Sequence, residues 1–300
     1  MSIVTVRAPS FEEQPVVALS RGHALWISVK RKPLGAVSAA LIAVIVLTAI
    51  FADVLAPYDP LATQPEIRLS PPSADHPFGT DDIGRDVLSR IIYGSRISLW
   101  VGLLAVGIGT AVGMVIGLLC GYCEGRVDLA LQRIMDAITA IPGLVLALAI
   151  VSVLTPNTTN AMIAIAVVII PGNSRIVRGA VLSAKQNRYV EAAQAMGCRH
   201  PRIILTHILP NVTAPILIIA SIWFGNAILI EASLSFLGVG TQPPTPSWGL
   251  MLSSTGRAFM EQAPWLAIFP GLAISLAVLG FNLFGDTLRD AWDPKLRNRS

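Results

Sequence analysis

Few residues in this chain of 300 amino acids have the types and spacing that chemistry at a site requires. Cys120 and Cys123 have the C-x-x-C spacing of thiol redox pairs and of zinc sites. A structural zinc site needs further Cys or His ligands, and the neighbouring sequence supplies none. Together with Cys198, these thiols are expected to be small apolar filler rather than a metal or redox site.

The segment 79–84 has the glycine spacing of a phosphate-binding loop, but its chemistry does not fit. Such a loop continues with a lysine and a hydroxyl residue, whereas Arg85 and Asp86 follow here. The acidic residues Asp81 and Asp82 would also repel a phosphate. We therefore expect a capped amphipathic turn, with an aspartate at a helix N-cap.

A short alanine-rich stretch beginning near residue 189 indicates a site for a protein partner. Its alanines favour helix, Gly197 can end that helix in the left-handed conformation, and Pro201 can begin a second short helix. An exposed helix of this length is marginally stable alone. We expect it to dock into a groove of a partner, with alanine allowing close approach and Glu191 offering a polar contact.

The composition indicates the environment in which these segments lie. Lys+Arg 22 and Asp+Glu 18 amount to 13% of the chain, whereas soluble domains carry about 25% charged residues. Hydrophobic residues make up 53%. These values exclude a disordered chain, and three cysteines are too few for a disulfide scaffold. The sequence therefore predicts an all-α, polytopic membrane protein.

Charge-poor runs of about 20 residues predict six transmembrane helices. The third and fourth share the charge-free stretch 137–174, which the turn-forming residues 155–160 divide. The spans are predicted at Leu34–Ala56, between Arg96 and Glu124, in the two halves of 137–174, at about Val212–Ile230, and at Pro264–Gly285.

The distribution of basic residues predicts the orientation. If the N-terminus is cytoplasmic, 17 of the 22 Lys and Arg residues lie on the cytoplasmic side. Both termini then lie in the cytoplasm, where the basic flanks meet anionic lipid. This placement accounts for the basic character of the chain, and no aromatic-interleaved basic patch supports nucleic-acid binding.

Small residues form a stripe in the second predicted span. Glycine recurs at every fourth position and removes side chains from one helix face, so that another backbone can approach closely. The partner of this face is either a helix of the same chain or another subunit. The stripe consists of Gly109, Gly113, Gly117 and Gly121.

The remaining charges near the spans are few. Asp136 follows Arg133 at the (i, i+3) spacing of a self-neutralising pair. Glu231 is expected at the outer end of the fifth span, where its side chain can reach the interface. Pro142, Pro171 and a further proline in the last span predict kinks.

The largest inner loop, 179–211, has a more specific pattern. It resembles the EAA loop of bacterial ABC importer permeases, which reads E-A-A, three residues, G, nine residues, and then I-x-L-P. His207 stands at the isoleucine position. The matching residues are Glu191, Ala192, Ala193, Gly197, Leu209 and Pro210.

Two outer segments and the C-terminal tail resemble one branch of that family, the C-type permeases of dipeptide and oligopeptide transport. They are residues 79–99, 234–249 and 285–295, and the likeness extends from about residue 20 to 297. The resemblance implies that the outer loop faces a solute-binding protein, through Asp81, Asp82, Arg85 and Asp86.

The resemblance implies a type I ABC importer permease fold in the bacterial inner membrane. The expected parts are a cytoplasmic segment 1–33, a first helix 34–56, an outer loop 57–96, a five-helix core 97–289 with its coupling loop, and a cytoplasmic tail 290–300. The chain would hold no cofactor and would not be an enzyme. ATP and Mg would be bound by two ATPase subunits, and the other partners would be a B-type permease and a periplasmic or lipid-anchored peptide-binding protein.

Other functions remain as alternatives. Nickel and opine permeases share the outer motifs, and their specificity resides largely in the binding protein. A secondary transporter would need buried titratable residues and internal repeats, and an intramembrane hydrolase would need a catalytic constellation within the spans. We find neither pattern, so peptide import powered by separate ATPases is the function expected.

Overall fold

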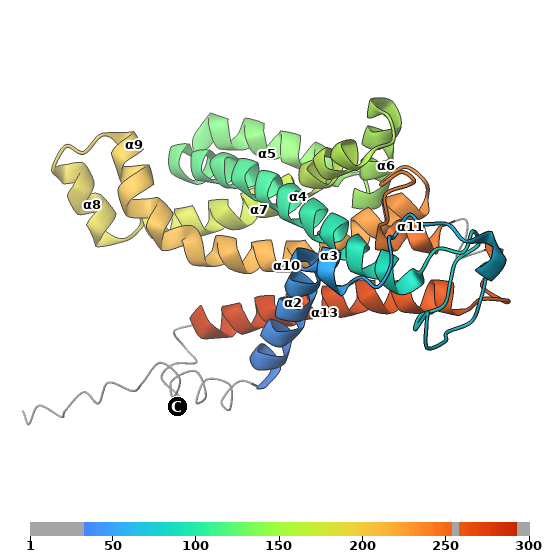
Figure 1. Cartoon of the computed structure of the whole chain (residues 1–300). Coiled ribbons are helices and arrows are strands. Elements are labelled where there is room, and N and C mark those ends of the chain that lie inside the picture. Colours follow the sequence, from blue (N-terminus) through green and yellow to red (C-terminus); the bar gives the residue numbers. More distant parts are fainter. Residues whose placement is uncertain (1–32, 254–257, 293–300) are drawn as a thin grey trace, which may run out of the picture.

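A computed structural model describes residues 33–253 and 258–292, and their regular elements are helical (Figure 1). The all-α prediction is confirmed. Most of the predicted N-terminal segment 1–33, Arg257 and the end of the predicted tail lie outside the described residues. Within the described residues, five helices are long and apolar enough to cross a membrane: α2 (Pro33–Ile50), α4 (Val87–Cys123), α7 (Thr158–Lys185), the helix that includes α10 (Leu209–Phe236), and α13 (Trp265–Trp292).

The third predicted span is a broken helix. α5 (Gly125–Thr139) and α6 (Gly143–Leu154) meet at 89°, and only as a pair do they qualify as a sixth span. Pro142 is the N-cap of α6 with extended ψ, so the chain turns there. The prediction of a span starting near residue 137 is therefore wrong in detail, because α5 begins earlier, at Gly125, and the helix breaks at this proline.

Proline has a different effect in the other spans. Pro171 lies inside α7 and Pro270 inside α13, and both helices continue through it. α10 likewise contains Pro215. A neighbouring helix can support the backbone carbonyl that a proline leaves free, which is why intramembrane prolines are tolerated.

α4 begins earlier than the predicted second span. It starts at Val87, so the end of the predicted outer loop 57–96 is helical and continuous with the predicted span. The helix continues through its basic residues, and Arg96 shows why: this residue has partners in the same chain. Arg96 donates to the backbone oxygens of Ala49 and Ile50, and it forms an ion pair with Asp53 of α3 (Ala52–Leu55) at 2.9 Å.

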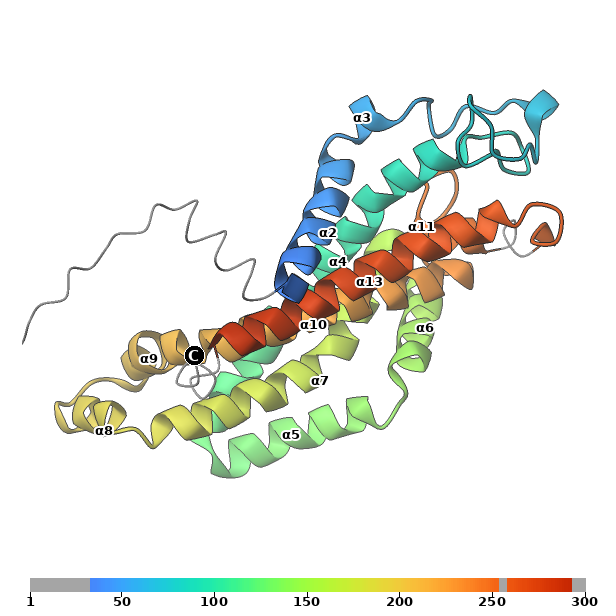
Figure 2. The same cartoon turned by 90° about the horizontal axis from the view of Figure 1, so that it is seen from below.

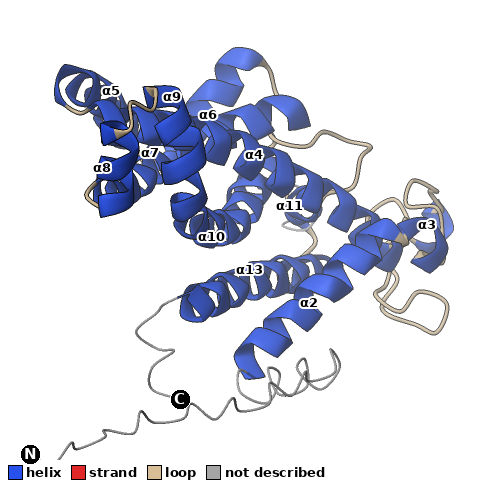
Figure 3. Ribbon diagram, turned by 90° about the vertical axis from the view of Figure 1, so that its left-hand side faces the viewer, coloured by secondary structure: helices blue, strands red, loops and turns tan. Residues whose placement is uncertain are grey.

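α4 and α7 form the centre of the bundle, with α10 packed against both. α13 lies along α10, and α2 crosses α13 and α4 (Figures 2 and 3). The largest apolar cluster joins α4, α6, α7 and α10 around side chains such as Val101, Val151, Ile165 and Ala227. This packing holds the long helices in fixed register between the two ends of the molecule.

The two ends carry different structures (Figure 1). At one end are α8 (Arg188–Ala195), α9 (His200–Arg202) and the π-helical turn η2 (Ile203–Ile208). At the other end are the loops before α4, which include the 3-10 turn η1 (Pro65–Ile67), together with α11 (Trp248–Leu252). The two sequence motifs are therefore separated by the full length of the bundle.

Candidate functional site

The alanine-rich segment forms the helix α8 and ends as its sequence predicts. Gly197 has a φ of 76°, the left-handed conformation that glycine adopts without steric cost. The amide of Cys198 donates to Ala193 O at 3.1 Å, and the amide of Gly197 donates to Gln194 O at 2.9 Å. These two bonds make a Schellman motif, so the predicted glycine C-cap is confirmed.

The two faces of α8 have different surroundings. Val190 and Ala193 point into the protein, where Ala193 is 1% exposed. Glu191 and Ala192 are exposed, and Met196 just after the helix is 76% exposed. The E-A-A triplet is thus divided: Ala193 anchors the helix to its own chain, while Glu191 and Ala192 remain available to a partner.

The segment after α8 leads directly into the membrane helix α10. Pro201 lies in the first turn of α9, as predicted, and η2 continues into α10. Pro210 is exposed in the first turn of α10 and Leu209 packs against the apolar cluster below α8. Ile203 and Ile208 are fully buried in that cluster. A force applied to α8 is therefore passed to α10 through packed apolar side chains.

We expect Gly197→Val to disorder the end of α8. A β-branched residue in the left-handed conformation costs about 1–2 kcal/mol. Hydrogen exchange at the amides of residues 195–198 should then be faster, whereas Gly197→Asn should retain most of the protection because asparagine tolerates this conformation. Equal protection in the two variants would contradict the role given to this cap.

The glycine stripe of α4 faces α7 of the same chain. A Cβ at Gly109 would lie 2.8 Å from Ala166 O, and one at Gly113 would lie 2.8 Å from Asn173 Cβ. At Gly117 and Gly121 the added atom would meet the Cβ of a valine of α7 at 2.6 and 2.7 Å. Of the two partners considered for this face, the structure places α7 there.

The acidic loop before α4 has the structure of a helix cap. Asp86 is the N-cap of α4 and accepts bonds at 2.7 Å from both the amide and the hydroxyl of Ser89, and His76 Nδ1 lies 2.9 Å from it. Asp81 accepts from Arg85 Nε at 2.6 Å, and its carboxylate lies 3.7 Å from Arg90 Nε. These bonds tie the loop to the start of α4.

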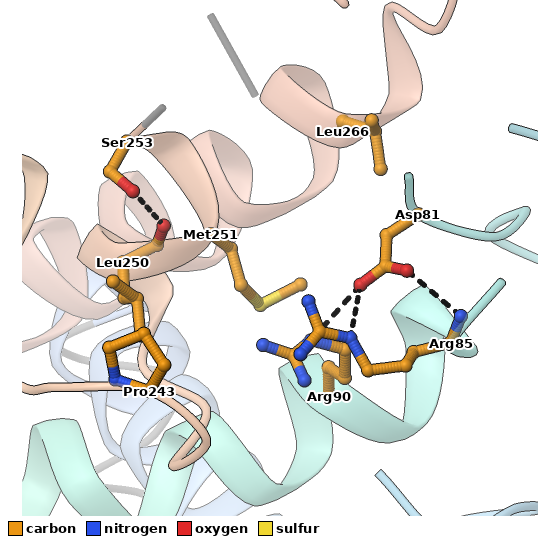
Figure 4. A pocket seen from close by; sticks show the side chains of 8 residues that line it. All are labelled: Asp81, Arg85, Arg90, Pro243, Leu250, Met251, Ser253 and Leu266. Carbon is orange, nitrogen blue, oxygen red and sulfur yellow. Dashed lines mark hydrogen bonds and ion pairs between the residues drawn. The ribbon is translucent and has the colours of Figure 1, made fainter. Parts of the chain in front are cut away.

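Asp81, Arg85 and Arg90 line a cavity of about 90 Å³, in which both guanidinium groups face the same oxygen of the Asp81 carboxylate (Figure 4). Asp81 is 5% exposed and Asp86 3% exposed, so neither carboxylate has a free surface for a docking protein. Both carboxylates have a structural role within this chain, and contact of this loop with a solute-binding protein stays a prediction. Asp82 and Arg85 are half-buried.

Glu231 is a residue whose position sequence reasoning placed wrongly. It was expected to reach the interface, but its side chain is 0% exposed inside the bundle. Its Oε1 accepts bonds from Ser235 Oγ at 2.7 Å and Thr241 Oγ1 at 3.2 Å, and the same serine hydroxyl accepts from the amide of Thr241. The sequence did contain one sign of this burial, the hydroxyl of Ser235 one helical turn after Glu231. This network fastens the loop after α10 to that helix.

Replacing Glu231 by leucine is expected to destabilise the outer end by about 2 kcal/mol or more, because buried hydroxyls lose their acceptor. Glu231→Gln keeps one acceptor and should be milder. Thermal unfolding in detergent measures the effect, and Glu261→Leu is the matched control at an exposed acidic residue. The network has no stabilising role if the two leucine variants unfold at the same temperature.

Ion pairs hold α5 against α7. Arg178 pairs with Asp128 at 2.5 Å, and Arg175 pairs with Asp136 at 2.8 Å. Arg133, the partner predicted for Asp136, is more distant at 3.9 Å. The closer contact is therefore between helices, which the sequence spacing alone did not indicate.

Metal ligands do not gather among residues 33–253 and 258–292, where no group of three or more His, Cys, Asp or Glu side chains converges. Cys120 is buried and its sulfur lies 3.4 Å from Gln132 Nε2. Cys123 is exposed and Cys198 is half-buried. The features of the described residues that remain for function are the contacts between helices and the two ends of the bundle.

Comparison with known proteins identifies the family. Residues 113–298 match the model of the binding-protein-dependent transport system inner membrane component, and residues 20–72 match the N-terminal TM domain of oligopeptide transport permease C. The fold is similar to a chain of the inward-facing MetNI methionine ABC transporter, with a TM-score of 0.57, 17% identity, and coverage of 68% of this chain and 96% of that chain.

Curated relatives match over nearly their whole length. The dipeptide transport system permease protein DppC of Alkalihalophilus pseudofirmus is 46% identical over 95% of this chain and 94% of its own. The di/tripeptide permease of Pseudomonas aeruginosa is 45% identical, over 85% and 86%. The glutathione permease GsiD of Escherichia coli O157:H7 is 45% identical, over 92% and 91%. This chain therefore belongs to the family of binding-protein-dependent transport system inner membrane components and is a permease subunit of an ABC transporter.

Proposed function

We propose that this chain forms half of the path by which an ATP-driven importer takes up dipeptides and other short peptides. The observation that carries the proposal is the similarity to peptide permeases over 95% of this chain. A relative named for glutathione, itself a tripeptide, supports the same substrate class. A B-type permease would supply the other half of the path, and a periplasmic or lipid-anchored binding protein would deliver the peptide.

Two ATPase subunits would provide the energy, one of them bound at the exposed face of α8. The separation of α8 from the outer loops supports this arrangement (Figure 1). The excess of basic residues on the α8 side supports a bacterial inner-membrane location, with that side and both termini in the cytoplasm. ATP binding would then close the ATPases and open the path outward.

Uptake by the complete transporter in proteoliposomes tests the substrate class. Labelled Ala-Ala, glutathione and nickel ions would be offered with the cognate binding protein. We expect uptake of at least one of the two peptides and no uptake of nickel ions. Nickel uptake without peptide uptake would instead identify a metal permease of the same family.

A further inference from the structure

Four polar side chains converge where the inner ends of the helices meet. The Tyr122 hydroxyl lies 2.6 Å from His200 Nδ1, and the two rings are in edge contact. Lys185 Nζ donates to Tyr122 O at 2.9 Å and to Glu124 Oε1 at 2.7 Å. Lys185 Nζ also lies 5.4 Å from the centre of the Tyr122 ring. We call Tyr122, Glu124, Lys185 and His200 the inner clamp.

The inner clamp joins parts of the chain that are distant in sequence. Tyr122 is in the last turn of α4, and Glu124 links α4 to α5. Lys185 is the last residue of α7, and His200 begins α9, directly after the α8 cap. Tyr122 is 8% exposed, whereas His200 is exposed, so the hydrogen bond lies at the edge of the packed core. The clamp thus connects the segment that carries the exposed α8 face to both central helices.

The helices behind the inner clamp form a rigid unit. α4 is continuous for 37 residues, which corresponds to about 55 Å at 1.5 Å per residue. Its glycine stripe fixes it against α7, and its outer end is capped by Asp86. A displacement applied at Tyr122 and Lys185 therefore moves α4 and α7 together, as far as the outer cap.

The apolar contacts under α8 are shared among α4, α7 and α10. Ile203 and Ile208 pack below α8 and continue into α10. The same cluster contains Leu118 of α4, Val177 of α7 and Val212 of α10, so the segment has an apolar connection to all three helices and, beside it, the polar connection of the inner clamp to α4 and α7. A hydrogen bond is directional, whereas apolar contacts tolerate sliding. The polar connection is therefore the one that fixes the direction of a transmitted movement.

We propose that the Tyr122–His200 hydrogen bond is a positioning contact that transmits movement of α8 to α4 and α7. The proposal rests on the proposed function, in which α8 binds an ATPase. Tyr122 and His200 then act through the helices they connect and touch neither ATP nor peptide. Loss of the bond leaves α8 attached through its apolar contacts, so the ATPases still bind and hydrolyse ATP while fewer cycles move the peptide.

The test compares Tyr122→Phe, His200→Ala and His200→Asn in the complete transporter. Phenylalanine keeps the ring contacts and removes the hydroxyl, and asparagine places a polar atom near the position of Nδ1. Reconstituted complexes are assayed for the number of labelled Ala-Ala or glutathione molecules taken up per ATP hydrolysed. Tyr58→Phe removes a comparable hydroxyl, bonded to Asp75 O, at the opposite end of the molecule and is the control.

Uptake per ATP is expected to fall about fivefold in Tyr122→Phe and in His200→Ala, the range expected for one lost hydrogen bond. His200→Asn should stay within about twofold of the unmodified protein, and Tyr58→Phe should be unchanged. The double variant Tyr122→Phe with His200→Ala should be no worse than either single variant, because both remove the same bond. A merely structural role would lower the yield of complex but not the ratio of uptake to hydrolysis.

Two different failures can be told apart. If the ATPase subunits co-purify with every variant and uptake per ATP is the same in all of them, the inner clamp is not the transmitting contact and the proposed function stands. If the ATPase subunits do not associate with the unmodified chain, the proposed function itself fails.

Discussion

Gly117→Leu is expected to prevent the chain from accumulating in a folded form. The first added atom would already lie 2.6 Å from Val177 Cβ and 2.7 Å from Ser174 O, and one of these neighbours is backbone that cannot rotate away. Overpacking a well-packed core costs about 1–3 kcal/mol for small additions, and a leucine adds far more than one methylene. Native stabilities are only about 5–15 kcal/mol.

The same α4 helix offers a matched control for this variant. An added Cβ at Gly107 meets no atom within 4 Å, so Gly107→Leu should leave the fold intact. Size-exclusion profiles and thermal unfolding of detergent-extracted protein measure the difference. The close α4–α7 seam would be contradicted if Gly117→Leu were as abundant and as stable as Gly107→Leu.

Glu191→Lys is expected to abolish ATPase binding and peptide uptake while the chain still inserts in the membrane. Glu191 is exposed on α8 and makes no contact on which the fold depends, so reversing its charge should act on a partner rather than on folding. Reversal at a contact that carries a charge-assisted bond costs several kcal/mol, and binding should weaken by more than about 100-fold.

Co-purification of the ATPase subunits with the permease measures this effect. Glu66→Lys makes the same charge reversal in an exposed position at the opposite end of the molecule, and it should retain the ATPases. If Glu191→Lys retained both the ATPases and uptake, the exposed face of α8 would not be their binding site.

Properties that depend on local sequence were predictable. Gly197 ends α8 and Pro201 lies in the first turn of α9 because capping and turn chemistry are decided within a few residues. The length of apolar runs located five of the membrane helices, since a bilayer imposes a minimum length, but not the broken pair of α5 and α6. The four-residue glycine period indicated a close seam before its partner was known.

Properties that depend on distant partners were not predictable from one sequence. Ala192 and Ala193 are identical in type, but only Ala193 is buried, because tertiary packing decides the orientation of α8. Glu231 is buried through hydroxyls of a loop whose path the sequence does not reveal. Tyr122 and His200 are 78 positions apart, and no spacing rule links them.

The energy source tests the central claim most directly. Proteoliposomes would contain the permease pair with or without the ATPase subunits, and peptide uptake would be measured with ATP on the α8 side or with an imposed proton gradient. Uptake is expected only with ATP and the ATPase subunits, at a rate that the gradient does not change. Gradient-driven uptake by the permease pair without the ATPases would contradict it.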